Sequence, residues 1–167
     1  MIPRKITSGG QTGADRAGLD FALANQIPVG GWCPKGRRAE DGVVPRRYQL
    51  QEHSDAAYQP RTIENIKDSD LTVVFARSPV SPGSRFTLNQ CRRHGKKHLW
   101  LANFPDAEAD ARCLRAALEA FDGVLHIAGS RESKCPGIYQ HTLRVLRLAI
   151  AQPTSVRNQE SSPLESA

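Results

Sequence analysis

The sequence predicts an α/β protein, a Rossmann-like domain of three layers in which helices cover both faces of a mainly parallel, five-stranded sheet. Short apolar segments rich in β-branched residues alternate along the chain with longer segments of helical periodicity. The short segments are apolar at consecutive positions, which is typical of parallel strands buried on both faces. Right-handed crossovers place the loops after such strands along one edge. We expect the strand order 3-2-1-4-5, with a ligand at the carboxyl edge where the order reverses.

The first third of the chain contains two strand segments. The first strand is expected at residues 4–7, which are β-prone and run into a glycine-rich turn. Helical periodicity begins after this turn and predicts a helix over 14–25. The next apolar segment predicts a strand at 28–32, and a helix at 60–68 precedes the third strand.

The middle of the chain repeats the strand–helix alternation. The strand expected at 71–76 has the sequence Leu-Thr-Val-Val-Phe-Ala, and the one expected at 98–102 has the sequence His-Leu-Trp-Leu-Ala. Residues 84–94 between them predict a helix. Ser84 at its start is either the N-cap or a phosphate contact, and Gly95 follows its expected end.

The last third carries the clearest helical patterns. The helix expected at 107–121 has an apolar stripe formed by Ala107, Ala111, Leu114, Leu118 and Phe121. A strand is expected at 123–127. The helix expected at 137–151 has a stripe formed by Ile138, Thr142, Val145, Leu146 and Ala149. We interpret both stripes as surfaces that face the core.

The length and composition predict a single domain. The chain has 167 residues, 39% hydrophobic and 24% charged, as in soluble globular proteins. We expect one ligand-binding domain over 1–152 and a disordered tail over 153–167, which is polar and lacks periodicity. No apolar run approaches the roughly 20 residues of a membrane span, and the start lacks the apolar core of a signal peptide. We therefore expect a cytoplasmic location and no membrane partner.

The cysteines and the net charge exclude some classes of function. Four cysteines stand far apart without a CxxC pair, which favours reduced thiols over a disulfide framework or a zinc site. The net charge of +6 suits an anionic ligand. The densest basic cluster, at 92–97, lies where a helix is expected to end, and cations there stabilise the helix dipole. No nucleic-acid-binding motif accompanies it, so no nucleic-acid partner is expected.

Residues 8–13, Ser-Gly-Gly-Gln-Thr-Gly, form the most informative turn of the chain. Glycines allow the main chain to approach a ligand closely, and the free amides at the next helix start attract anions. We interpret the turn as a phosphate-binding loop, although a tight connection also favours glycine. Its spacing matches neither GxGxxG nor a P-loop.

Three further segments carry polar residues at the same predicted edge. Residues 33–42 form a long excursion, which is either a functional loop or a surface flap. Arg61 either contacts an anion or pairs with Glu64 or Asp68. Residues 128–138 are rich in Gly, Ser and Arg. Because these segments are expected side by side, together they predict an extended anionic ligand.

Five motifs, in this order, resemble the molybdenum cofactor carrier family of Rossmann-like proteins, distantly related to the Lonely Guy hydrolases. The resemblance covers roughly residues 4–150. The motifs are Ser8-Gly9-Gly10-Gln11-Thr12-Gly13-Ala14-Asp15-Arg16-Ala17, Cys33-Pro34-Lys35-Gly36-Arg37-x-x-Glu40-Asp41-Gly42, Arg61-Thr62-x-x-Asn65, Ser81-Pro82-Gly83-Ser84-x-x-Thr87 and Arg131-Glu132-Ser133-x-x-Pro136-Gly137-Ile138.

The resemblance implies a homo-oligomer, with a tetramer as one form, that binds molybdenum cofactor (molybdopterin), a pterin with a phosphate and a dithiolene-held metal. No metal ligated by protein side chains is expected, because the cofactor brings its own dithiolene. The residues implied to bind the cofactor are Ser8, Gly9, Gly10, Gln11, Thr12, Gly13, Asp15, Lys35, Gly36, Arg37, Arg61, Thr62, Asn65, Gly83, Ser84, Thr87, Arg131, Glu132, Ser133 and Gly137.

One departure from the related hydrolases bears on catalysis. Their Pro-Gly-Gly-x-Gly-Thr-x-x-Glu loop carries the glutamate that serves cleavage, whereas the matching run 82–90 has Phe86 in place of a Gly and ends in Gln90. An uncharged amide cannot act as a general base. We therefore expect no catalytic residue of that kind, and a protein that carries a phosphorylated pterin without catalysis. The alternatives are a nucleotide-processing enzyme or a sensor of nucleotide derivatives, and an interaction module.

Overall fold

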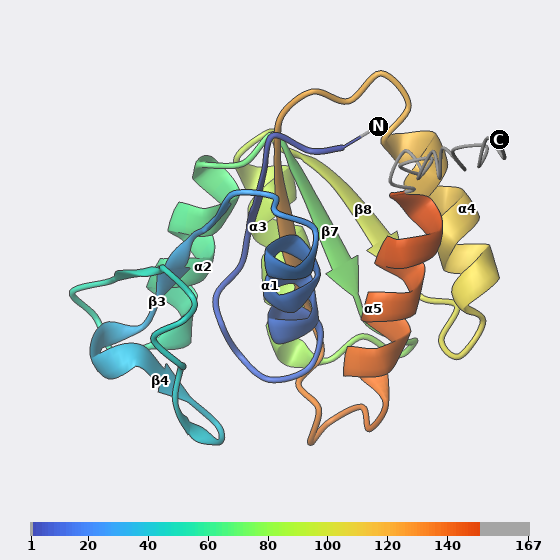
Figure 1. Cartoon of the computed structure of the whole chain (residues 1–167). Coiled ribbons are helices and arrows are strands. Elements are labelled where there is room, and N and C mark those ends of the chain that lie inside the picture. Colours follow the sequence, from blue (N-terminus) through green and yellow to red (C-terminus); the bar gives the residue numbers. More distant parts are fainter. Residues whose placement is uncertain (1, 151–167) are drawn as a thin grey trace, which may run out of the picture.

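The computed structural model describes residues 2–150, and the tail expected at 153–167 lies outside the described residues. The main sheet is five-stranded and all parallel, formed by β1 (Lys5–Thr7), β2 (Val29–Gly30), β7 (Leu71–Phe75), β8 (Lys97–Leu101) and β9 (Val124–Gly129). Five helices flank it: α1 (Ala14–Ala24), α2 (Tyr58–Lys67), α3 (Pro82–Arg93), α4 (Ala107–Ala117) and α5 (Ile138–Ala149). In Figure 1, α1, α4 and α5 lie in front of the sheet and α2 and α3 behind it, which confirms the three-layer α/β class.

The predicted strand order is wrong, because the last strand does not lie at an edge. The sheet runs β2-β1-β9-β7-β8, so β9 is central and pairs with both β1 and β7. If β9 is counted as the first strand, followed by β1, β2, β7 and β8, the same sheet has the order 3-2-1-4-5. The order therefore reverses between β9 and β7, one strand away from the glycine-rich turn that follows β1. Apolar composition shows that a strand is buried, but it does not specify which strands are its neighbours.

Most predicted elements are confirmed, with shifted boundaries. The strand expected at 28–32 is divided at Gly31, whose φ of 118° lies in the left-handed region. Its second part, β3 (Trp32–Cys33), pairs with β6 (Gln51–Glu52) in a separate two-stranded sheet. The N-cap of α3 is Ser81 rather than Ser84, because the Ser81 hydroxyl accepts a hydrogen bond from the Ser84 amide at 3.4 Å.

The segment expected to be a long loop after β3 has its own small structure. It contains a 3-10 turn (Lys35–Arg37) and a hairpin of β4 (Arg38–Ala39) and β5 (Gly42–Val43). Six buried residues form a satellite core beneath it: Leu19, Cys33, Ala39, Val44, Tyr48 and Leu50.

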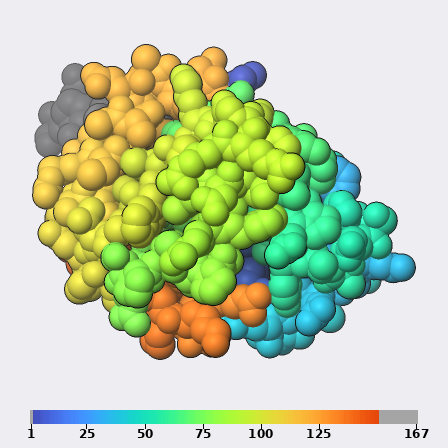
Figure 2. Space-filling model, turned by 180° about the vertical axis from the view of Figure 1, so that it is seen from behind, coloured from blue at the N-terminus to red at the C-terminus, as the bar shows by residue number. Residues whose placement is uncertain are grey.

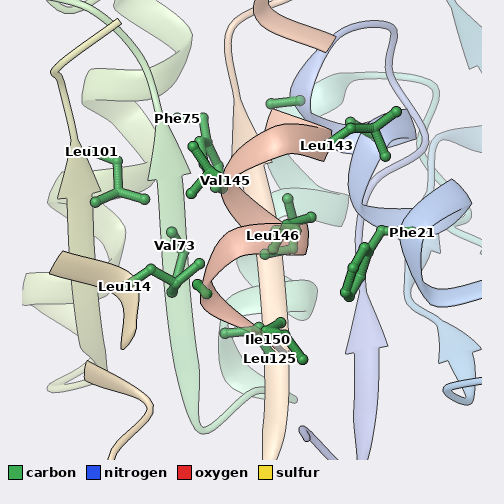
Figure 3. Packing of buried hydrophobic residues seen from close by; sticks show 14 of the residues in the cluster. Phe21, Val73, Phe75, Leu101, Leu114, Leu125, Leu143, Val145, Leu146 and Ile150 are labelled. Atoms are coloured by element: carbon green, nitrogen blue, oxygen red, sulfur yellow. The ribbon is translucent and has the colours of Figure 1, made fainter. Parts of the chain in front are cut away.

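The main core lies between the sheet and the helices α1, α4 and α5. Figure 3 shows Leu146 of α5 over the sheet, with Phe21 of α1 and Leu114 of α4 among the neighbouring apolar side chains. The predicted apolar stripes belong to this cluster or pack against it, except for the polar Thr142, which is also buried, so their interpretation as core is confirmed. Within residues 2–150, no helix combines the length and the apolar character that crossing a membrane requires.

The opposite face of the sheet is more polar. The pairing register places Thr7 of β1 and Thr72 of β7 on either side of His126 of β9, and all three are buried. The apolar cluster on this side is smaller and is formed by Val74, Ala76 and Leu88 with Val80. This face, beneath α2 and α3, leaves room for a cavity.

Candidate functional site

A cavity of about 580 Å³ opens at the carboxyl edge of the sheet, on the side of α2 and α3. Four separate segments line it: the start of α1, the start of α2, the start of α3, and the end of β9 with its following loop. Figure 2 shows the hollow between α3 (yellow-green) and the α2 region (green), with blue atoms of the N-terminal part at its floor and the orange loop after β9 below. The cavity therefore lies beside the point where the strand order reverses.

Three side chains make up what we call the buried end of the cavity: Gln11, Asp15 and Arg61, which are 5%, 3% and 8% exposed. Arg61 Nη1 lies 3.7 Å from Asp15 Oδ2, which also accepts a hydrogen bond from the Gln11 amide at 3.3 Å. Burial raises the pKa of Asp15, while the facing Arg61 opposes that rise. Burial also lowers the pKa of Arg61, although a guanidinium keeps its proton in proteins.

Gly9 allows Arg61 to occupy this position. A Cβ at residue 9 would lie 1.8 Å from Arg61 Nη1, so the guanidinium packs directly on the glycine. The pairing with Asp15 replaces the surface partners considered from the sequence, Glu64 and Asp68. Arg61 Nε is buried and has no hydrogen-bond partner within residues 2–150.

The side chain of Gln11 has a defined orientation. Two main-chain amides, of Thr12 and Glu40, donate to Gln11 Oε1 at 3.0 and 2.9 Å. An atom that accepts from two N–H donors is the carbonyl oxygen, so the other terminal atom is the NH₂ group. This Nε2 is buried and has no partner among the described residues. Gln11 and Arg61 thus each retain a buried N–H group that no atom of the described residues accepts.

The N-terminus of α3 forms the other end of the cavity. Pro82 is the first helical residue, and a Cβ at Gly83 would meet nothing within 4 Å. Backbone amides and the helix dipole make such a terminus favourable for an anion. The loop after β9 adds two cations to the cavity wall, Arg131 and Lys134.

Three guanidinium groups surround the ring of Tyr58. The Cζ atoms of Arg131, Arg38 and Arg61 lie 4.7, 5.2 and 5.9 Å from the ring centroid. Tyr58, Arg61 and Arg131 line the cavity. Cation–π contacts hold these cations in place. Arg131 adds positive charge to the cavity wall, whereas Asp15 compensates the charge of Arg61.

The glycine-rich turn has fewer free amides than its sequence predicts. The amides of Gln11 and Thr12 are bonded to side chains, and the amide of Ala14 donates to Ser130 O at 3.2 Å. Gly13 packs against the loop after β9, because a Cβ there would lie 2.4 Å from Ser130 O. This glycine is required by a backbone contact, and a larger residue at this position would disturb the fold.

Glu40 joins three segments at the edge of the site. Its carboxylate accepts hydrogen bonds from the Thr12 hydroxyl and from Ser133, through the amide at 3.3 Å and the hydroxyl at 2.5 Å. Burial favours a higher pKa for Glu40, but the hydrogen bonds from Ser133 and Thr12 outweigh it, and the net result is a lowered pKa. Beside it, Asp41 accepts a bidentate pair from Arg16 at 2.6 and 2.8 Å.

The sequence-predicted residues fall into three groups. Those that line the cavity are Gln11, Asp15, Arg61, Thr62, Gly83, Ser84, Thr87 and Arg131. Those that build the adjoining turn and loop, without lining the cavity, are Ser8, Gly9, Gly10, Thr12, Gly13, Glu132, Ser133 and Gly137. Those whose contacts lie elsewhere are Lys35, Gly36, Arg37 and Asn65.

Several predicted residues form contacts within the protein. Arg37 is buried and donates to the carbonyl oxygens of residues 44, 45, 48 and 50, which holds this segment together. Asn65 bonds to both main-chain polar groups of Trp32 at 2.8 and 2.9 Å. Glu132 accepts from the Gly137 and Tyr139 amides at 2.6 and 3.0 Å and so caps α5.

The cavity wall also contains residues that were not among the expected cofactor-binding residues, although several lie within the predicted motifs and segments: Tyr58, Gln59, Ser81, Pro82, Phe86, Ala128, Gly129 and Lys134. For Tyr58 a signal exists in the sequence, because it stands three positions before Arg61 and so shares a face of α2 with it. Within residues 2–150, no group of three or more His, Cys, Asp or Glu residues has the proximity that a metal site needs.

Comparisons with known proteins agree with this architecture. The profile of the circularly permutated YpsA SLOG family matches residues 6–150. A crystal structure from Syntrophus aciditrophicus, printed as "Putative molybdenum carrier protein", is similar over 89% of this chain and 95% of its own chain, with 42% identity and a TM-score of 0.83. No curated protein matches the chain. The central position of β9, which acts as the first strand of a 3-2-1-4-5 sheet, is the arrangement that a permuted chain produces. The chain belongs to the circularly permutated YpsA SLOG family.

Proposed function

We propose that this protein binds a phosphorylated pterin, molybdenum cofactor, and carries it without catalysis. The observation that supports the proposal most directly is a single cavity lined both by the N-terminus of α3 and by the buried polar residues Gln11, Asp15 and Arg61. Family membership supports a ligand-binding role. The printed name of the similar structure points to a molybdenum compound as the ligand.

The start of α3 is the proposed phosphate subsite. Gly83 leaves open space where other residues carry a Cβ, so a phosphate can approach the Gly83 amide at the helix terminus closely. Arg131 and Lys134, from the loop after β9, provide charge-assisted contacts to the same group. In the glycine-rich turn the amides of Gln11, Thr12 and Ala14 have partners within the protein. At the start of α3 the amides of Ser84 and Arg85 donate to Ser81, so the proposed contact is to the Gly83 amide and the helix dipole.

The pterin ring is proposed to occupy the space between this helix terminus and the buried end. Phe86 and Tyr58 line that part of the cavity, and aromatic surfaces suit a flat heterocycle. A volume of about 580 Å³ falls in the usual range for small-molecule sites. The metal of the cofactor, held by its own dithiolene, needs no protein ligand in this proposal.

The arrangement of carboxylates supports binding without catalysis. Asp15 is the single carboxylate among the cavity-lining residues, and it faces Arg61. Glu40, Asp41 and Glu132, the other carboxylates considered for acid–base chemistry, are engaged by hydroxyl, amide or guanidinium groups of the protein. A nucleotide-processing enzyme is the second candidate, because the phosphate subsite also suits a nucleoside monophosphate.

Gly83→Val is the sharpest test of the phosphate subsite. The added side chain points into open space, so the fold is expected to remain intact, but it obstructs the amides of α3. We expect the affinity for molybdenum cofactor to fall at least about tenfold, the effect of losing charge-assisted contacts. The affinity is measured by titration with freshly prepared cofactor.

Glu108→Val is the matched control, because it places the same side chain at the second position of α4, outside the cavity. Equal affinity in Gly83→Val and the wild type would place the phosphate elsewhere. Release of free base from AMP or GMP by the wild type would favour the enzymatic alternative. A homo-oligomer is also part of the proposal, and light scattering after gel filtration checks it.

A further inference from the structure

We propose that the buried end of the cavity recognises the amino-oxo-pyrimidine edge that pterins and guanine share. This inference rests on the proposed function, because it concerns the ring of the ligand that the same cavity binds. It goes further by predicting which heterocycles the site accepts. Guanine nucleotides are expected to bind, whereas adenine and hypoxanthine nucleotides are expected to bind more weakly.

The three residues of the buried end offer both kinds of hydrogen-bonding group. Asp15 contributes a carboxylate that is 3% exposed. Its Oδ2 accepts from the Gln11 amide, and a carboxylate has about four lone-pair sites, so acceptor capacity remains. Gln11 Nε2 and Arg61 Nε are buried donors without partners in the described chain. An unpartnered donor of this kind costs free energy unless a ligand supplies the acceptor.

The charge balance distinguishes this end from the phosphate subsite. The charges of Arg61 and Asp15 compensate each other at 3.7 Å, so the buried end has no excess charge to attract a phosphate. The excess positive charge of the cavity wall lies on Arg131 and Lys134, from the loop after β9, and these cations have no carboxylate partner at hydrogen-bond distance among the described residues. A ligand with a phosphate at one end and a neutral polar ring at the other matches this division.

The amino-oxo-pyrimidine edge has the complementary pattern. It presents a ring N–H and an adjacent exocyclic NH₂, which suit the two oxygens of a carboxylate, and a carbonyl that accepts from Gln11 or Arg61. Hypoxanthine lacks the exocyclic NH₂. Adenine has an amino group where guanine has the carbonyl, so it would place a donor against the donors of Gln11 and Arg61.

The test compares GMP, IMP and AMP by calorimetric titration, in parallel with a pterin phosphomonoester. We expect GMP to bind at least about tenfold more tightly than IMP or AMP, the usual size of a charge-assisted hydrogen bond. In Asp15→Asn, the preference for GMP over IMP is expected to fall below about threefold. The control Asp20→Asn changes an α1 carboxylate that bonds to Tyr48 and Tyr139, outside the cavity, and should keep the preference.

Gln11→Glu provides a second variant that leaves both residues of the Asp15–Arg61 pair in place. The remaining oxygen can still accept from the Thr12 and Glu40 amides, but the donor Nε2 is lost. We expect the preference for GMP over AMP to fall at least about tenfold. Because each variant is judged by the ratio of two ligands measured on the same protein, partial loss of folded protein does not alter the conclusion.

The outcomes separate this inference from the proposed function. Equal binding of GMP and IMP by the wild type, or unchanged ratios in both variants, overturns the inference, while binding of the pterin phosphomonoester still supports the function. A preference for GMP that depends on Asp15, without pterin binding, supports the inference and contradicts the function. If no ligand binds, both are wrong.

Discussion

At the scale of single residues, similar sequence signals have different structural causes. Gly9, Gly13 and Gly83 were all expected at a ligand site. Gly83 faces open space in the cavity, whereas Gly9 contacts the Arg61 guanidinium and Gly13 contacts the backbone at Ser130. A glycine motif therefore indicates that close approach is possible: at Gly9 and Gly13 the approaching group is the protein itself, whereas at Gly83 the space is open.

The sequence predicted eight residues that line the cavity, including Asp15, Arg61 and Arg131. It could not predict which of the expected residues line the cavity and which contact other parts of the protein instead. Arg37, like Arg61, is a motif arginine that was expected to bind the cofactor. It instead donates hydrogen bonds to four carbonyl oxygens of its own loop. That difference depends on long-range packing, and residue type and spacing do not reveal it.

His126 is expected to control acid stability. It is fully buried in β9, its Nδ1 lies 3.3 Å from the Thr72 hydroxyl, and its Nε2 has no partner among the described residues. Burial, with a smaller effect from Arg61, lowers its pKa to about 3, from 6.5 for an ordinary histidine. Between these values the unfolded chain binds a proton that the folded state does not, so acidification favours unfolding by about 1.4 kcal/mol per pH unit.

The measurement is the free energy of unfolding by urea at several pH values between 7 and 4. We expect His126→Gln, which cannot titrate, to lose less stability on acidification than the wild type over this range. The exposed His94 provides the control, and His94→Gln should follow the wild type. Parallel curves for the wild type and His126→Gln would show that His126 is not the group responsible.

At the scale of elements, the predictions succeeded where local periodicity determines the structure. The helix expected at 14–25 and the strand expected at 71–76 agree with α1 and β7 to within one residue at each end. Residues 33–42 were interpreted as a long loop, either functional or a surface flap. Their structure depends on distant partners, namely the four carbonyl bonds of Arg37 and the contacts of Glu40.

The Glu40 contact is expected to hold the β4–β5 hairpin against the loop after β9. Glu40→Gln keeps the size of the side chain but removes the charge that strengthens the bonds from Thr12 and Ser133. We expect faster hydrogen exchange at the amides of Ser133 and Glu132. Because the site is exposed, the free energy of unfolding should fall by no more than about 1 kcal/mol.

Hydrogen exchange measured by NMR checks this expectation. The control is Glu52→Gln, since Glu52 accepts from the Gly36 amide at 2.8 Å in the same part of the molecule but does not contact the loop after β9. It should leave the exchange of Ser133 unchanged. If Glu40→Gln also leaves it unchanged, the loop is held by other contacts, such as the bonds from Glu132 to the start of α5.

At the scale of the whole molecule, the sequence predicted the layers and the edge that carries the site, but not the position of β9. Strand order depends on pairing between distant segments. Here β9 occupies the gap between β1 and β7, where Gly129 permits an approach to Phe75 O that a Cβ, at 2.2 Å, would block. The placement matters for function because it brings the loop after β9 to the centre of the cavity wall.

The strand order predicts that a rearranged chain will fold. A permutant that begins at Ala120, in the connection between α4 and β9, and joins Ile150 to Ile2 through a flexible linker has the conventional order 3-2-1-4-5. Figure 1 shows that α5 returns to the end of the sheet where the chain starts, so a short linker suffices. We expect the same fold and ligand affinity, with a loss of stability of about 2 kcal/mol or less, the size of a loop-closure cost.

The comparison is with a second permutant cut between Ser133 and Lys134, inside the loop that lines the cavity. That cut breaks the chain between α5 and the residues Glu132 and Ser133, whose hydrogen bonds hold the loop in place. It is therefore expected to weaken ligand binding even if the protein folds. Circular dichroism, urea unfolding and ligand titration distinguish the two. If the permutant that begins at Ala120 fails to fold, the connection between α4 and β9 stabilises the fold in addition to linking the two elements. The first contact to examine is then the ion pair between Asp122 in this connection and Arg4, just before β1.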